Sequence, residues 1–222
     1  MGSMKAGQSR LMHWYALGAS LLAWAALGMQ LYIVLAIRYA SGESLIGGLF
    51  NFLSFFTVLA NILAALALSA SVRPGMAGSN PFFSRPSVVS AIAAYITLVG
   101  LAYSLLLRHL WQPQGWQLVA DRLLHDVMPL LFLLYWWLFV PKAFLRWRDV
   151  LGWALFPALY LVYALLRGAA FGLYPYHFID AGQLGYAQVA LNSTGILIGF
   201  VAIALLLVVL DRHKGKEPLR ES

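Results

Sequence analysis

Six long apolar blocks run through the chain, and they constrain its fold more than any other feature. They cover residues 11–37, 50–70, 87–107, 123–140, 150–167 and 190–210. A helix needs about 20 apolar residues to cross the hydrocarbon core of a bilayer, and each block is close to that length. Only 10% of the residues are charged, whereas soluble domains carry about 25%. We therefore expect an all-α, polytopic integral membrane protein built as a bundle of six transmembrane helices.

The spacing of the blocks leaves no room for a separate soluble domain, so residues 1–222 are expected to form one membrane domain. Residues 1–3 look like a cloning scar before Met4, and residues 211–222 are predicted to form a cytoplasmic tail. The chain contains no cysteine, which excludes disulfides, zinc–thiolate sites and iron–sulfur clusters.

Lysines and arginines divide unevenly between the two sides of a six-span bundle. The side of the two termini holds Lys5, Arg10, Arg73, Arg85, Lys142, Arg146, Arg148, Arg212, Lys214, Lys216 and Arg220. The other side holds Arg38, Arg108, Arg122 and Arg167. The positive-inside rule then places both termini in the cytoplasm. Because the basic residues lie at helix ends rather than in one patch, we expect no nucleic-acid partner.

Polar residues inside an apolar block are informative, because each must find a partner or water within the membrane. The second block carries Asn51, Ser54, Thr57 and Asn61. A single straight helix would place all four on one face about 120° wide. Such residues often serve only to hydrogen-bond neighbouring helices. The other interpretation is that they line a polar site.

The fourth block opens with a second polar cluster of Asp121, His125 and Asp126. Asp121 and His125 are four residues apart and share a helix face, whereas Asp126 points about 100° away. Pro129 removes the backbone hydrogen bond to the carbonyl of His125 and is expected to kink the helix. A lone histidine near a helix end is also compatible with simple exposure to water.

The expected topology brings the two clusters to one side of the membrane, because blocks two and four both begin on the extracytoplasmic side. The connection before the last block, and the start of that block, add His177, Asp180 and Asn192 there. These groups either face water or form an outward-facing polar pocket. Only one histidine lies within a span on that side, so we expect no haem, no metal site and no other cofactor.

A threonine and a histidine that meet in such a pocket are suited to acyl transfer. His125 would act as the base that takes the hydroxyl proton of Thr57. Three carboxylates are candidates for orienting the imidazole: Asp121, Asp126 and Asp180. Three amide or hydroxyl groups are candidates for donating a hydrogen bond to the developing oxyanion: Asn51, Ser54 and Asn61.

Two of these segments resemble motifs of a known membrane protein family. The residues FFTVLANIL at 55–63 are similar to the F-[FY]-T-x-x-[SA]-N-x-[LI] segment of the androgen-induced and androgen-dependent TFPI-regulating membrane proteins and their bacterial six-span relatives. The residues HDVMP at 125–129 resemble the H-x-x-x-P segment of the same family. The Tyr-Pro pair at 174–175, before the last block, also fits.

The resemblance implies an intramembrane threonine hydrolase of lipid esters. Eukaryotic members of the family hydrolyse fatty acid esters of hydroxy fatty acids with a threonine and a histidine. By motif, these roles fall on Thr57 as the nucleophile and His125 as the base. Membrane lipids and a lipid ester substrate are then the expected partners. The loops, rich in arginine and proline, look bacterial, which places the protein in the inner cell membrane.

Other classes of function are compatible with the same residues. A small-molecule transporter or lipid-binding protein would use an outward polar pocket too, although the chain shows no internal repeat and no carboxylate at the membrane centre. A haem protein would need a second facing histidine within the spans. A structural or assembly role is a further alternative. The residues predict no particular oligomeric state.

Overall fold

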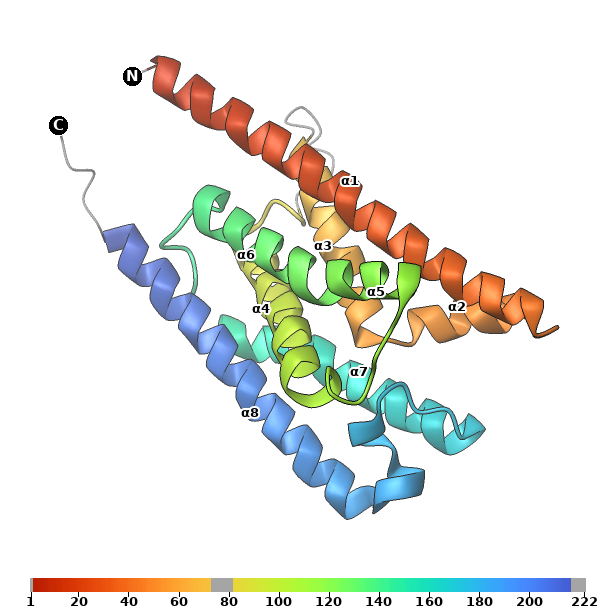
Figure 1. The fold of residues 1–222 in the computed structure, drawn as a ribbon. Helices are drawn as coiled ribbons and strands as arrows, with labels where there is room; N and C mark the ends of the chain where they lie inside the picture. Colours follow the sequence, from red (N-terminus) through yellow and green to blue (C-terminus); the bar gives the residue numbers. More distant parts are fainter. Residues whose placement is uncertain (1, 73–81, 217–222) are drawn as a thin grey trace.

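The computed structural model describes residues 2–72 and 82–216, and this part of the chain forms helices and turns but no strand (Figure 1). The α-helices are α1 Gly2–Ala40, α2 Leu45–Leu53, α3 Phe56–Val72, α4 Pro86–Ala102, α5 Gly115–Arg122, α6 Met128–Phe139, α7 Asp149–Phe171 and α8 Ala181–Lys216. Two π-helical turns, η1 Tyr103–Leu107 and η2 Leu123–Val127, continue α4 and join α5 to α6. The short 3₁₀ turn η3 His177–Ile179 precedes α8. The connection 73–81 and residues 217–222 of the predicted tail lie outside the described residues.

Four helical segments have the length and apolar composition of membrane spans: Gly7–Ala40, Pro86–Leu107, Asp149–Phe171 and Ala181–Gly215. The pair α2 and α3 reaches the same standard only when it is counted as one bent span. Large apolar side chains are exposed along these helices, for example Leu155 and Leu159 on α7, as expected for contact with lipid. The described residues therefore form a membrane-embedded helical protein with four such spans, or five with the bent pair.

The predicted fourth span lies within one helical run that extends from α5 through η2 to α6. Its apolar part is short, because α6 has 12 residues. Such a helix rises about 18 Å, less than the hydrocarbon core of about 30 Å. The preceding turns carry Asp121, His125 and Asp126. This run therefore contributes polar groups to the interior rather than a long apolar helix.

The expectation of a straight helix through residues 50–70 is wrong, because α2 and α3 meet at an angle of 76°. The break falls between Leu53 and Phe56. There Ser54 Oγ donates to the carbonyl of Asn51 at 2.6 Å, and Ser54 O accepts from Tyr160 Oη at 2.9 Å. These bonds satisfy polar groups that the helix itself leaves free. The predicted common face of residues 51, 54, 57 and 61 does not exist.

Helix α4 lies centrally and packs against α3, α6, α7 and α8, while α1 runs along α3 on the far side from α8 (Figure 1). Fully buried alanines, among them Ala60, Ala64, Ala93 and Ala94, line the contact regions of α3 and α4. Small side chains let membrane helices approach closely. The start of α1 and the end of α8 lie toward the same end of the bundle (Figure 1).

The two π-turns contact each other, because Tyr103 of η1 stacks on His125 of η2. Pro129 lacks an N–H, so it cannot bond to the carbonyl of His125, and the π-turn η2 directly precedes the helix that carries this proline. A Cβ atom on Gly100 would lie 3.2 Å from that carbonyl oxygen. Glycine therefore lets α4 approach η2 closely. Single π-turns inside helices frequently mark functional sites.

Candidate functional site

Thr57 and His125 lie together in the interior, as the two sequence motifs predict. Thr57 Oγ1 is 3.3 Å from His125 Nε2. The threonine is 8% exposed, and the histidine side chain is 16% exposed. A nucleophile and its base need to lie within hydrogen-bond reach, and the distance is often slightly long in the absence of substrate. The threonine hydroxyl can therefore pass its proton to the imidazole.

The second ring nitrogen of His125 is held by Asp121. His125 Nδ1 lies 3.0 Å from the carbonyl oxygen of Asp121 and 3.3 Å from its Oδ1. The carboxylate is 4% exposed, and its Oδ2 accepts a 2.5 Å hydrogen bond from Tyr103 Oη. The Tyr103 ring stacks on the imidazole, with ring centroids 4.0 Å apart. A proton on Nδ1 satisfies Asp121 and leaves Nε2 free to accept from Thr57.

The other two candidate carboxylates have different partners. Asp126 forms ion pairs with two arginines, Arg108 and Arg122. Asp180 accepts hydrogen bonds from two backbone N–H groups and caps the start of α8. Among the described residues, Asp121 is thus the one of the three that contacts the imidazole.

Asn61 connects the two elements that carry Thr57 and His125. This side chain is fully buried, and its Nδ2 donates to the carbonyls of Thr57 at 2.9 Å and Leu124 at 3.2 Å. Its Oδ1 has no hydrogen-bond partner in the described part of the chain. Asn61 therefore fixes α3 against η2, and its donor group is already used by backbone carbonyls.

The remaining predicted pocket residues lie away from the threonine hydroxyl. Asn51 is on α2, where its Oδ1 accepts from Arg167 at 3.2 Å. Asn192 donates to the carbonyl of Phe178 at 2.9 Å and holds η3 against α8. His177 is exposed on η3. Like Ser54 at the helix break, Asn51 and Asn192 have structural contacts rather than contacts with the Thr57–His125 pair.

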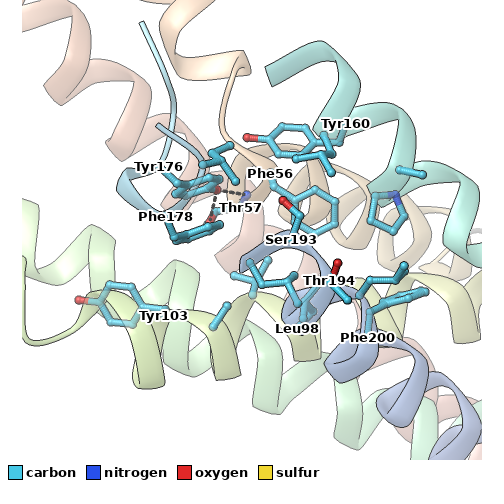
Figure 2. A pocket seen from close by; sticks show the side chains of 18 of the residues that line it. Phe56, Thr57, Leu98, Tyr103, Tyr160, Tyr176, Phe178, Ser193, Thr194 and Phe200 are labelled. Atoms are coloured by element: carbon cyan, nitrogen blue, oxygen red, sulfur yellow. Dashed lines mark hydrogen bonds between the residues drawn. The ribbon is translucent and has the colours of Figure 1, made fainter. Parts of the chain in front are cut away.

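Sequence reasoning missed Tyr176, which contacts the nucleophile directly. The backbone N–H of Thr57 donates to Tyr176 Oη at 3.1 Å, and Tyr176 Oη lies 3.2 Å from Thr57 Oγ1 (Figure 2). The two residues are 119 positions apart in the chain. A Tyr-Pro-Tyr turn before the last helix gives no signal of this contact. Nothing in the sequence around Tyr103 indicates its contacts with Asp121 and His125 either.

An apolar cavity of about 390 Å³ opens beside Thr57, enclosed by α3, α4, α7 and α8 (Figure 2). Phe56, Leu98, Tyr160 and Phe200 form much of its wall. Binding sites for small molecules are commonly of about 300–1,000 Å³, with apolar walls and a few polar groups. In the described part of the chain, no cluster of three or more His, Cys, Asp or Glu residues has the geometry to hold a metal ion.

No family model, curated protein or solved structure compared with this chain matches it. The resemblance noted for residues 55–63 and 125–129 therefore depends on those motifs alone.

Proposed function

We propose that this protein is a membrane-embedded hydrolase of lipid esters, with Thr57 as the nucleophile and His125 as the general base. The approach of Thr57 Oγ1 to His125 Nε2 carries the proposal, because the other ring nitrogen is held by the buried Asp121. The adjoining apolar cavity is suited to an acyl chain. The motif resemblance supports the same roles and suggests fatty acid esters of hydroxy fatty acids as a substrate class.

The reaction follows from these contacts in two stages. Thr57 Oγ1 attacks the ester carbonyl carbon while its proton passes to His125 Nε2, and the carbonyl electron pair moves onto oxygen. Collapse of this intermediate expels the alcohol, which takes the proton from His125 and leaves an acyl-threonine. His125 then deprotonates a water molecule, which attacks the acyl carbon. The bond from this carbon to Thr57 Oγ1 breaks, Oγ1 takes the proton back from His125, and the fatty acid is released. Asp121 stabilises the imidazolium that forms at each stage.

The proposed topology has six spans, with both termini in the cytoplasm and the site toward the extracytoplasmic side of a bacterial inner membrane. The distribution of lysine and arginine supports this orientation. The start of α1 and the end of α8 at one end of the bundle agree with it (Figure 1). In this arrangement the run from α5 to α6 is the sixth crossing, and its polar half faces the site.

A lipid-binding or transport protein is the second candidate function, and the size and apolar walls of the cavity favour it. A direct assay separates the two. The purified protein in detergent is incubated with long-chain esters, and the released fatty acid is quantified; the hydrolase proposal expects catalytic turnover. Saturable ester uptake into proteoliposomes without any fatty acid release would contradict the hydrolase and favour transport.

Ala158→Phe tests whether the cavity holds the acyl chain. Ala158 lines the cavity on α7, so a phenyl ring there would occupy space that a long chain needs. We expect kcat/KM for hexadecanoyl esters to fall by about 10–100-fold, the usual effect of altering an apolar pocket, and butanoyl esters to be nearly unaffected. The neighbouring Leu159 faces outward with 60% exposure, so Leu159→Phe is the matched control. Equal losses for both chain lengths would place the chain elsewhere.

Asp121→Asn tests the orienting carboxylate. An amide cannot stabilise the imidazolium and can hold the ring in the wrong tautomer, so kcat should fall by on the order of 10²-fold or more. Asp126→Asn is the control, because Asp126 pairs with arginines and not with the imidazole. Steady-state ester hydrolysis measures both. If the two variants lost activity equally, Asp121 would have no special role as the partner of His125.

A further inference from the structure

The bend between α2 and α3 places the start of a helix inside the protein, directly at the nucleophile. Thr57 is the second residue of α3, so its N–H has no carbonyl partner within the helix. That N–H donates instead to Tyr176 Oη at 3.1 Å. A backbone N–H at the nucleophile is a common donor to the oxyanion of acyl transfer. Here that N–H is bonded to the Tyr176 oxygen, so the donor that remains available beside the nucleophile is the Tyr176 hydroxyl.

The Tyr176 hydroxyl has a proton available for donation at this point. Its oxygen accepts from the N–H of Thr57, which leaves its own O–H directed to Thr57 Oγ1 at 3.2 Å or to a substrate atom. When Oγ1 bonds to a carbonyl carbon, the carbonyl oxygen sits on the same carbon. The negative charge that develops on this oxygen therefore lies within reach of the groups that surround Oγ1.

Packing holds the Tyr176 ring in place before any substrate arrives. Its ring stacks on Phe178 with centroids 5.1 Å apart and planes 8° apart, and Asn192 fixes the carbonyl of Phe178 at 2.9 Å. The preceding Tyr174 ring packs on Gly168 so closely that a Cβ atom there would lie 2.0 Å from it. A donor fixed in this way needs no reorganisation as charge develops. Burial also raises the pKa of Tyr176, which keeps the phenol protonated.

We propose that Tyr176 is a catalytic residue that donates a hydrogen bond from its hydroxyl to the oxyanion of the tetrahedral intermediate, while the N–H of Thr57 keeps its bond to the tyrosine oxygen. As the bond between Thr57 Oγ1 and the carbonyl carbon forms, the proton of Thr57 goes to His125 and the carbonyl electron pair moves to oxygen. Tyr176 keeps its own proton throughout. This inference rests on the proposed hydrolase function and adds a third residue to its machinery.

Tyr176→Phe tests the inference, because it removes the hydroxyl and keeps the ring that stacks on Phe178. Loss of one oxyanion donor should lower kcat by about 10²–10³-fold, with little change in KM. The affinity for a long-chain trifluoromethyl ketone, which forms a tetrahedral adduct with the nucleophile, should fall by a similar factor. The affinity for the fatty acid product should stay the same. Tyr186→Phe is the matched control, because Tyr186 on α8 is 65% exposed.

The outcomes separate this inference from the function on which it rests. Hydrolysis by the wild type with unchanged kcat in a folded Tyr176→Phe variant would overturn the role of Tyr176 alone. Absence of hydrolysis by the wild type would overturn the proposed function and this inference with it. Should Tyr176→Phe fail to fold, 3-fluorotyrosine at position 176 keeps both ring and hydroxyl. Its more acidic phenol should shift the alkaline limb of the kcat profile to lower pH, and an unmoved limb would contradict the donor role.

Discussion

Thr57→Ala should abolish ester hydrolysis in a protein that stays folded. In the proposed mechanism, the hydroxyl oxygen that this change removes forms the bond to the acyl group. We expect kcat to fall by at least about 10⁴-fold, as in enzymes that lose their nucleophile. The folding cost should be small, because among the described residues the hydroxyl has hydrogen-bond partners only in His125 and Tyr176, while the backbone N–H keeps its bond to Tyr176. Measuring fatty acid release at saturating ester concentration for both proteins gives the ratio of their kcat values.

Thr57→Ser is the matched control for this experiment. It restores a hydroxyl at the same position and should recover a substantial part of the activity, since serine is activated by the same imidazole. Activity of Thr57→Ala close to that of the wild type would show that another group attacks the ester. Equal inactivity of the serine variant, with a normal thermal unfolding curve, would show that the hydroxyl is not sufficient.

His125→Gln should have the second largest effect, a fall in kcat of about 10⁴-fold, which is the upper end of what general base catalysis contributes. Glutamine has a similar reach and can still hydrogen-bond Thr57, but it cannot take a proton. The substitution therefore separates proton transfer from positioning. The assay is the same fatty acid release, with KM determined to show that substrate binding is retained.

The control for the base is His177→Gln. His177 is exposed on η3, near Tyr176 in the sequence, and it has no contact with Thr57 in the described residues. We expect it to keep wild-type kcat. Comparable losses at positions 125 and 177 would contradict the assignment of one histidine as the base. A wild-type kcat in the His125→Gln variant would show that His125 is not the general base.

The sequence predicts the helical membrane class, because the apolar blocks are long and lie where α1, α4, α7 and α8 are found. It also predicts that Thr57 and His125 can meet, since the second and fourth apolar blocks begin on the same side of the membrane and their polar groups must find partners there. The four-residue spacing of Asp121 and His125 survives the local π-turn, and the two side chains contact each other.

The sequence does not predict the geometry that makes the site specific. At the 76° bend after α2, the carbonyl of Ser54 accepts a hydrogen bond from Tyr160, which is far along the chain. Local periodicity gives no sign of it, and a straight helix wrongly groups Asn51 with Thr57. The contacts of Tyr103 and Tyr176 likewise come from tertiary packing, in residue types that are common at membrane interfaces.

The most direct measurement locates the activated nucleophile itself. The purified protein is treated with a fluorophosphonate probe, digested, and mapped by mass spectrometry, with His125→Gln treated in parallel. We predict a covalent adduct on Thr57 in the wild type and its loss in the His125 variant, which cannot activate the hydroxyl. An adduct on a different residue, or hydrolysis of esters by a protein whose Thr57 never reacts, would contradict it.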